Sequence, residues 1–243
     1  MTIQYATNQN IGLITLDQTP YNQLESPLFA DPEELREFLA QPHLKGIIIQ
    51  GRGRHFSAGA DRQVLAKQLR EPHLLGEKIN QGKALLRMIH EAELPIVAVI
   101  KGSCLGAGLE IALACHFRFA APSAMLGFPE TDLQLMPGFG GTFFGSTVSE
   151  RRILIDLMLS AKLISAEEAL QIGLIDRIYP AKTLLNEARR YLNRLTEKRP
   201  AHLIRAVMQA IHNSGRMSME EALQSETALF IHVAQKRTEQ TRQ

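Results

Sequence analysis

Two short segments rich in small residues could bring backbone N–H groups close to a ligand. One spans residues 55–61, His-Phe-Ser-Ala-Gly-Ala-Asp, and the other spans residues 102–110. Each follows a predicted buried strand and leads into a predicted helix, and small side chains let the backbone approach a ligand closely. Either segment alone is also typical of an ordinary tight strand-to-helix connection. Together they predict two donors that converge on one oxyanion.

Glu110 closes the second segment and lies within an apolar run. Leu109 precedes it, and Ile-Ala-Leu-Ala follows at positions 111–114. A glutamate seen alone is more often a solvated helix residue or a partner of the helix dipole. Because apolar residues surround Glu110 here, the sequence favours a buried or cleft-lining carboxylate. Burial raises a carboxylic pKa, which suits proton transfer near neutral pH.

The elements that must position these residues alternate along the first part of the chain. The pattern predicts βαβ units and a largely parallel sheet. Beyond residue 145 the apolar residues recur with helical spacing, and Ser165 with Glu168 predicts a capping box. We expect an α/β core over residues 1–180 and a helical portion over residues 181–243. Strands are expected at 11–16, 45–50, 94–100 and 117–121, and helices at 31–40, from 62 to about 90, and at 109–115, 182–198, 201–213 and 218–236.

Composition narrows the class of partner. The 27 Lys and Arg residues nearly balance the 25 Asp and Glu residues, which argues against nucleic acid or an anionic membrane as the partner. Cys104 and Cys115 are too few for a disulfide framework and lack metal-ligand spacing. No basic segment followed by an apolar core opens the chain, and no apolar run of about 18 residues occurs. We therefore expect a cytoplasmic protein without a membrane span.

Four motifs in order along the chain resemble the signatures of the enoyl-CoA hydratase/isomerase, or crotonase, family. They lie at residues 56–61, at 102–110, at 126–130 (Leu-Gly-Phe-Pro-Glu) and at 137–142 (Pro-Gly-Phe-Gly-Gly-Thr). The resemblance covers most of the chain, from about residue 11 to about residue 230. It implies an α/β fold of the ClpP/crotonase-like type, a spiral of ββα units, with a helical C-terminal portion used for trimerisation.

The resemblance also implies which residues form the site. The backbone N–H groups of Ala58 and Ala107 match the two donors of the family's oxyanion hole. Glu110 matches the carboxylate that helps to activate water for attack at the β-carbon. Glu130 matches the one that delivers or removes the proton at the α-carbon, although it could also be an ordinary turn carboxylate. Neighbouring residues are expected to contact the substrate: Ser57, Ala60, Asp61, Gly106, Pro129 and Gly138.

The paired glutamates predict an enoyl-CoA hydratase-like lyase that adds or removes water across the α,β double bond of an acyl thioester. No metal or redox cofactor is implied, since coenzyme A or phosphopantetheine enters as part of the substrate. Double-bond isomerisation and decarboxylation are the alternatives within the family. A non-catalytic thioester- or RNA-binding relative is the alternative from another class. A serine hydrolase ranks last, because Ser57 and Ser103 have no convincing His and Asp partners in the sequence.

The sequence departs from the family's pattern in three places. Phe143-Phe144-Gly145 stands where most relatives continue with Gln-Arg-Leu, and His116 stands where relatives usually have Asp. The final residues lack the usual terminal segment that contacts the CoA nucleotide. An acyl carrier protein therefore stays open as the bearer of the substrate. The resemblance further implies a homotrimer or a hexamer.

Several polar residues receive no role. His116 and His232 are each isolated in the sequence, and a lone histidine is more often structural than catalytic. Lys67, Lys78 and Lys83 fall on the helical stretch between the two small-residue segments, where one of them could meet a phosphate or carboxylate. A solvated charged face is the preferred interpretation of the three lysines.

Overall fold

The computed structural model describes residues 2–241, and its largest element is a six-stranded sheet. The strand order is β1-β2-β3-β4-β6-β9. β1 pairs antiparallel with β2, whereas every other neighbouring pair is parallel, as the alternating pattern predicts. The strands are β1 (Thr2–Asn8), β2 (Ile11–Asp17), β3 (Gly46–Gly51), β4 (Ile96–Ile100), β6 (Phe117–Ala120) and β9 (Arg177–Ile178).

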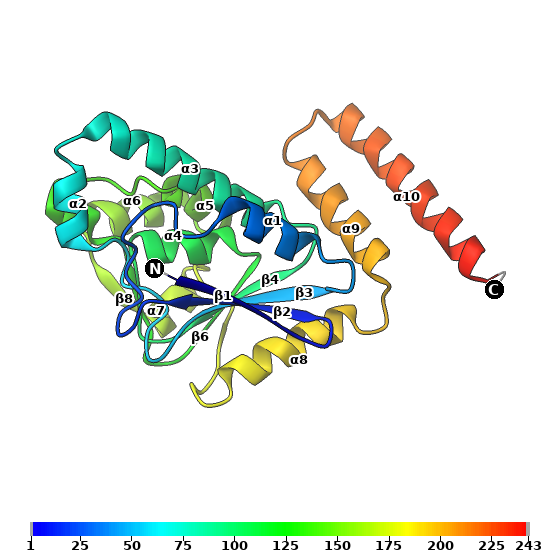
Figure 1. Cartoon of the computed structure of the whole chain (residues 1–243), viewed down its shortest axis with the longest axis horizontal. Helices are drawn as coiled ribbons and strands as arrows, with labels where there is room; N and C mark the ends of the chain where they lie inside the picture. Colours follow the sequence, from blue (N-terminus) through cyan, green and yellow to red (C-terminus); the bar gives the residue numbers. More distant parts are fainter. Residues whose placement is uncertain (1, 242–243) are drawn as a thin grey trace.

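Helices cover both faces of this sheet. Figure 1 shows α3 (Pro72–His90) and α4 (Ala107–Ala114) on one side and α8 (Leu184–Thr196) on the other. Alternate residues of the central strands explain the two layers, since Ile47 and Ile49 face the larger apolar core while Ile48 packs with Leu192 of α8. Both faces being buried accounts for the nearly continuous apolar runs in β3 and β4.

A second, smaller sheet lies beside the ends of the main strands. Its strands are β5 (Ser103–Leu105), β7 (Met125–Gly127) and β8 (Leu163–Ser165), with β5 parallel to β7 and β7 antiparallel to β8. These strands were not expected, because each has only three residues and carries too little periodicity to be recognised. The remaining elements between β3 and β9 are α2 (Arg62–Gln68), the 3₁₀ helix η1 (Pro129–Leu133), α5 (Gly141–Val148), α6 (Arg151–Leu159) and α7 (Ala166–Gln171).

The helix boundaries follow local signals. α1 (Pro32–Ala40) begins after Asp31, whose side chain accepts from two backbone N–H groups, and the expected capping box of Ser165 and Glu168 is present at α7. The helix expected from 62 to about 90 is divided into α2 and α3, because Pro72 starts a new helix at its first position.

The last two helices form a hairpin that projects from the body. α10 (Met219–Thr241) lies alongside α9 (Ala201–Ser214), and Figure 1 shows both extending away from the main sheet. α8 differs from them, because it packs on the sheet although it lies in the expected helical portion after residue 180. Among the described residues, no helix combines the length and the apolar character needed to cross a membrane.

Candidate active site

The two small-residue segments lie side by side. The Leu105 N–H donates to the Ser57 carbonyl at 3.0 Å, and Ser57 and Cys104 form a parallel bridge between the segments. Gly59 has a φ of +84°, and a Cβ placed on it would lie 2.6 Å from the Leu105 carbonyl oxygen and 3.4 Å from the Ala107 nitrogen. Only glycine allows this approach. The expected convergence of the two backbones is therefore present.

The prediction that the Ala58 N–H is one of the two oxyanion donors is wrong. This N–H donates to the Tyr21 carbonyl at 2.9 Å and is not available to a ligand. Within residues 2–241, neither the Ala60 N–H nor the Ala107 N–H donates to a protein acceptor, and both residues line the same cavity. Ala107 is the first residue of α4, so its N–H has no partner within the helix. The available pair is thus Ala60 and Ala107.

Ser57 was expected to contact substrate, but it supports the loop instead. The Ser57 side chain is fully buried, and its hydroxyl donates to the Asn22 carbonyl at 2.7 Å and accepts the Gly59 N–H at 3.1 Å. Asn22 is also buried, and its side-chain amide donates to the carbonyls of His55 and Arg52 at 2.9 Å each. These bonds fix the course of the segment before Ala60.

A cavity of about 520 Å³ lies in front of the two segments and is called here the carboxylate cavity. The Asp61 carboxylate accepts from the N–H groups of Gln63 and Val64 and so caps α2, which occupies its Oδ1 atom in a structural role. Of the residues expected in the site, all except Ser57 line this cavity: Ala58, Ala60, Asp61, Gly106, Ala107, Glu110, Pro129, Glu130 and Gly138.

Glu110 lines the carboxylate cavity from α4 and is almost completely buried, with 1% of its surface exposed. Its Oε1 accepts the N–H of Gly141 at 2.7 Å and that of Phe139 at 2.8 Å. Burial raises the pKa of Glu110 to about 7, the charge of Glu130 raises it further, and the two N–H donors and Lys83 act in the opposite direction. Desolvation dominates, so this carboxyl group titrates near neutral pH.

Glu130 faces the cavity from η1, directly after Pro129. Burial raises the pKa of Glu130 to about 7, and its Oε2 is buried without a hydrogen-bond partner among the described residues. A polar atom left in this state is costly unless a ligand or water completes it. The geometry thus provides a carboxyl oxygen without a protein partner on a residue that lines the cavity.

Gly106 allows Glu130 to lie close to the start of α4, where Ala107 and Glu110 are located. Its φ is +50°, and a Cβ there would lie 2.6 Å from the Glu130 Oε1. Its N–H donates to the Gly127 carbonyl at 2.9 Å, which ties the start of α4 to β7 and thereby to η1. Two N–H donors and two carboxyl groups of near-neutral pKa are thus gathered around one cavity.

The α/β fold with its C-terminal helices is of the crotonase type. The solved structures that resemble this chain share the fold. An enoyl-CoA hydratase from Polaromonas sp. JS666 matches with a TM-score of 0.85 and 25% identity, covering 95% of this chain and 90% of that one. An enoyl-CoA hydratase from Bacillus anthracis matches with a TM-score of 0.83 and 28% identity, covering 97% of this chain and 92% of that one.

The protein belongs to the enoyl-CoA hydratase/isomerase family, whose sequence model matches residues 6–242. A probable enoyl-CoA hydratase of Bacillus subtilis is 34% identical over 94% of this chain and 88% of its own length. The peroxisomal fatty acid beta-oxidation multifunctional protein AIM1 of Arabidopsis thaliana is 32% identical over 88% of this chain. The chain spans only 29% of AIM1, so the similarity concerns one part of that larger protein.

Proposed function

We propose that this protein is an enoyl thioester hydratase. The observation that carries the proposal is the pair of carboxyl groups, Glu110 and Glu130, each with its pKa raised to about 7, in the same cavity as two unoccupied backbone N–H donors. Hydration requires a base for water and an acid for carbon, and two groups that titrate near neutral pH can fill both roles.

The N–H groups of Ala60 and Ala107 would bind the thioester carbonyl oxygen. When water adds to the β-carbon, negative charge develops on this oxygen as the enolate forms. Donors that are fixed before the reaction stabilise this charge without reorganisation, at about 3 to 4 kcal/mol for each donor in comparable sites. The loop bonds of Ser57 hold the Ala60 side of the pair in place.

One of the two carboxyl groups would then accept a proton and the other would donate one. Ionised Glu110 removes a proton from water as the oxygen bonds to the β-carbon, and protonated Glu130 delivers its proton to the α-carbon. The net change is the addition of one water, and the proton gained by Glu110 returns through solvent to Glu130. The partnerless Oε2 of Glu130 supports the assignment of this residue to the proton at carbon.

Hydration of crotonyl-CoA by matched variants tests the proposal. We expect Glu110→Gln and Glu130→Gln each to lower kcat by about 10²- to 10⁴-fold, the usual contribution of a general acid or base. Glu77→Gln on the exposed surface of α3 is the control and should keep full activity. Full activity in either site variant would contradict the assignment. Conversion of 3-enoyl-CoA without hydration would favour isomerisation. Release of carbon dioxide from a β-carboxylated acyl thioester without hydration would favour decarboxylation.

We also propose that the protein assembles into a homotrimer or a pair of trimers. Support comes from the α9–α10 hairpin, whose apolar side chains are unusually exposed for helices that pack mainly on each other. A second copy of the chain could bury this surface. The exposed apolar residues on the hairpin include Val207, Ile211, Leu223, Phe230 and Ile231, with exposed fractions between 50% and 72%.

A further inference from the structure

A second cavity, of about 1100 Å³, adjoins the carboxylate cavity and is called here the histidine cavity, after His90, His116 and His212 in its wall. The two cavities have three lining residues in common, namely Ile79, Met136 and Gly138. A group that extends from the carboxylate cavity past these residues would therefore enter the histidine cavity. The oxyanion donors and both glutamates lie on the near side of this boundary.

The wall of the histidine cavity carries an excess of positive charge. Lys83, Arg87, Arg118 and Arg216 line it, against the single carboxylate of Glu91. Its remaining wall is largely apolar and includes Leu113, Phe143, Phe144, Met208 and Ile211. A largely apolar cavity with cationic groups in its wall fits a ligand with a hydrocarbon body and an anionic terminus.

Three of these cations are already paired. Arg87 and Arg216 share Glu91, with shortest N–O distances of 3.6 Å and 2.9 Å. The buried Arg118 lies 3.4 Å from Asp176 and donates to two backbone carbonyls. These arginines have structural partners that a ligand would have to displace.

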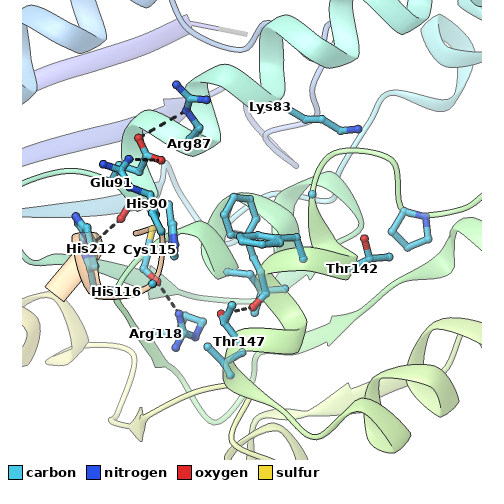
Figure 2. A pocket seen from close by; sticks show the side chains of 18 of the residues that line it. Lys83, Arg87, His90, Glu91, Cys115, His116, Arg118, Thr142, Thr147 and His212 are labelled. Carbon is cyan, nitrogen blue, oxygen red and sulfur yellow. Dashed lines mark hydrogen bonds and ion pairs between the residues drawn. The ribbon is translucent and has the colours of Figure 1, made fainter. Parts of the chain in front are cut away.

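Lys83 is different. Within the described part of the chain, its ammonium group has no ion pair and no hydrogen bond, and Figure 2 shows its side chain set apart from Arg87, Glu91 and the histidines. Its charge nevertheless reaches Glu110, because it lowers the pKa of that carboxyl group. Lys83 is thus an available cation within electrostatic range of Glu110.

We propose that Lys83 binds a carboxylate at the far end of the acyl group, so that the preferred substrates are thioesters of dicarboxylic acids. The inference rests on the proposed thioester site. With the thioester oxygen at Ala60 and Ala107, the acyl chain passes Ile79 and Met136, and its terminal carboxylate meets Lys83. A lysine ammonium pairs with one carboxylate as a point charge, so it selects for the charge and for the length of the chain.

Equilibrium binding of saturated thioesters tests the proposal without depending on turnover. The ligands are hexanoyl-CoA and adipoyl-CoA, which have equal chain length and differ in the terminal carboxylate, with succinyl-CoA and suberoyl-CoA to vary the length. We expect adipoyl-CoA or one of the other dicarboxylic thioesters to bind roughly three- to tenfold more tightly than hexanoyl-CoA, as befits a partly solvated ion pair. Lys83→Met should abolish this ratio.

Lys78→Met is the matched control, because Lys78 lies on α3 as an exposed lysine but does not line the histidine cavity. Removing it subtracts the same charge from the helix and should preserve the ratio. A ratio near one in the wild type, a ratio unaffected by Lys83→Met, or equal losses in both variants would overturn the proposal. Hydration of hexenoyl-CoA without a dicarboxylate preference would overturn this inference alone, whereas a Lys83-dependent preference without hydration would overturn the hydratase assignment alone.

Discussion

Glu110 and Glu130 are held in different ways, and this difference bears on their roles. Glu110 has one carboxyl oxygen fixed by two backbone N–H groups, whereas the buried Oε2 of Glu130 has no partner among the described residues. Two donors at Oε1 favour the ionised form of Glu110 and keep its carboxylate in one orientation. A fixed base and a freer acid fit a reaction in which water must be aimed and a proton must reach carbon.

The pH dependence of hydration follows from the two raised pKa values. Burial raises the pKa of both Glu110 and Glu130 to about 7, and the proposed reaction needs the first ionised and the second protonated. As the pH falls below this value Glu110 takes up a proton, and as the pH rises above it Glu130 loses one. We expect a bell-shaped profile of kcat/KM with its maximum near neutral pH. Steady-state rates over a pH series check this, and a profile flat across neutrality would contradict it.

Glu110→Gln should stabilise the folded protein at alkaline pH while it removes activity. The folded-state pKa of about 7 exceeds the ordinary value of 4.5, so the folded state binds more protons between these values and the free energy of unfolding falls as the pH rises through them. Glutamine is neutral, and its amide oxygen can still accept from Phe139 and Gly141. We expect a gain of up to about 3 kcal/mol at about pH 8 and little gain at about pH 4.

Urea unfolding at both pH values measures this difference. Glu167→Gln serves as the control, since Glu167 is exposed on α7 and should give no pH-dependent gain. An equal change in stability at both pH values would show that the charge of Glu110 costs the fold nothing.

The burial of Glu110 could be predicted from the sequence, but the identity of the first N–H donor could not. The apolar neighbours of Glu110 are visible in the sequence, and α4 buries that residue as they indicate. The choice between Ala58 and Ala60 depends on which N–H meets the Tyr21 carbonyl. That contact joins segments far apart in the chain, and no local pattern reports it. The sequence signal that came nearest to identifying this donor is Asp61, a typical helix-capping residue, because the Ala60 N–H lies immediately before it at the start of α2.

The turn that begins α4 determines whether the N–H donors and the two carboxyl groups lie around the same cavity. Gly106 adopts a positive φ there, and its missing side chain leaves room for Glu130. The short strands β5 and β7 hold this turn against η1 through the Gly106 to Gly127 bond. They were missed in the sequence because elements of three residues depend on partners distant in the chain rather than on their own pattern.

Gly106→Ala should therefore reduce activity more than a simple loss of stability explains. An added Cβ would lie 2.6 Å from the Glu130 Oε1, and the Gly106 backbone, with a φ of +50° and a ψ of −125°, is unfavourable for alanine by about 1 to 3 kcal/mol. We expect a loss of at least about tenfold in kcat for crotonyl-CoA hydration, with the protein still folded by circular dichroism.

Gly76→Ala is the matched control on α3, since a Cβ there meets no atom within 4 Å. It should raise the melting temperature slightly, because alanine favours a helix more than glycine does. Equal activity in the Gly106 and Gly76 variants would show that the turn tolerates a side chain and that Glu130 is not displaced.

Three imidazoles join the projecting α9–α10 hairpin to the body of the protein. His212 of α9 stacks on His116 with ring centroids 5.5 Å apart and on His90 with centroids 6.0 Å apart. The Nδ1 atom of His116 accepts the Ile96 N–H at 3.0 Å, which requires that nitrogen to be unprotonated. His116 appeared isolated in the sequence because its partners come from α3 and α9.

Acidification should weaken this junction. Burial, followed by the charges of His212 and His90, lowers the pKa of His116 from 6.5 to about 3, so the folded state binds fewer protons between these values. The free energy of unfolding therefore falls as the pH drops below about 6.5. Burial also lowers the pKa of His90 and His212, although the charge of nearby Glu91 acts in the opposite direction, and Arg118 further lowers the pKa of His116.

His116→Asn separates the imidazole's charge from its hydrogen bond. The asparagine amide oxygen can accept the Ile96 N–H but does not titrate, so the decline in stability between about pH 6.5 and pH 4 should become shallower by about 1 to 3 kcal/mol. Chemical unfolding across this range measures the slope. His232→Asn is the control, since His232 lies exposed on α10 outside this group, and it should leave the slope unchanged.

The exposed apolar surface of α9 and α10 predicts an assembly in which further copies of the chain cover it. Phe230 is 72% exposed and Ile231 is 50% exposed, and burying such side chains between copies is worth about 1.5 to 3 kcal/mol each. We expect wild-type protein to elute with the mass of a trimer or hexamer in light scattering after gel filtration. Phe230→Ser should weaken association by about tenfold or more and shift the mass toward the monomer on dilution.

Leu159→Ser distinguishes this interface from general surface hydrophobicity. Leu159 is also 72% exposed but lies on α6, away from the hairpin, so its substitution should not change the mass. Wild-type protein that is monomeric at all concentrations would rule out the assembly. If Phe230→Ser lowers the mass while hydration persists, the contact made by the hairpin is not needed for catalysis, in keeping with a carboxylate cavity whose lining residues in this chain all precede residue 164.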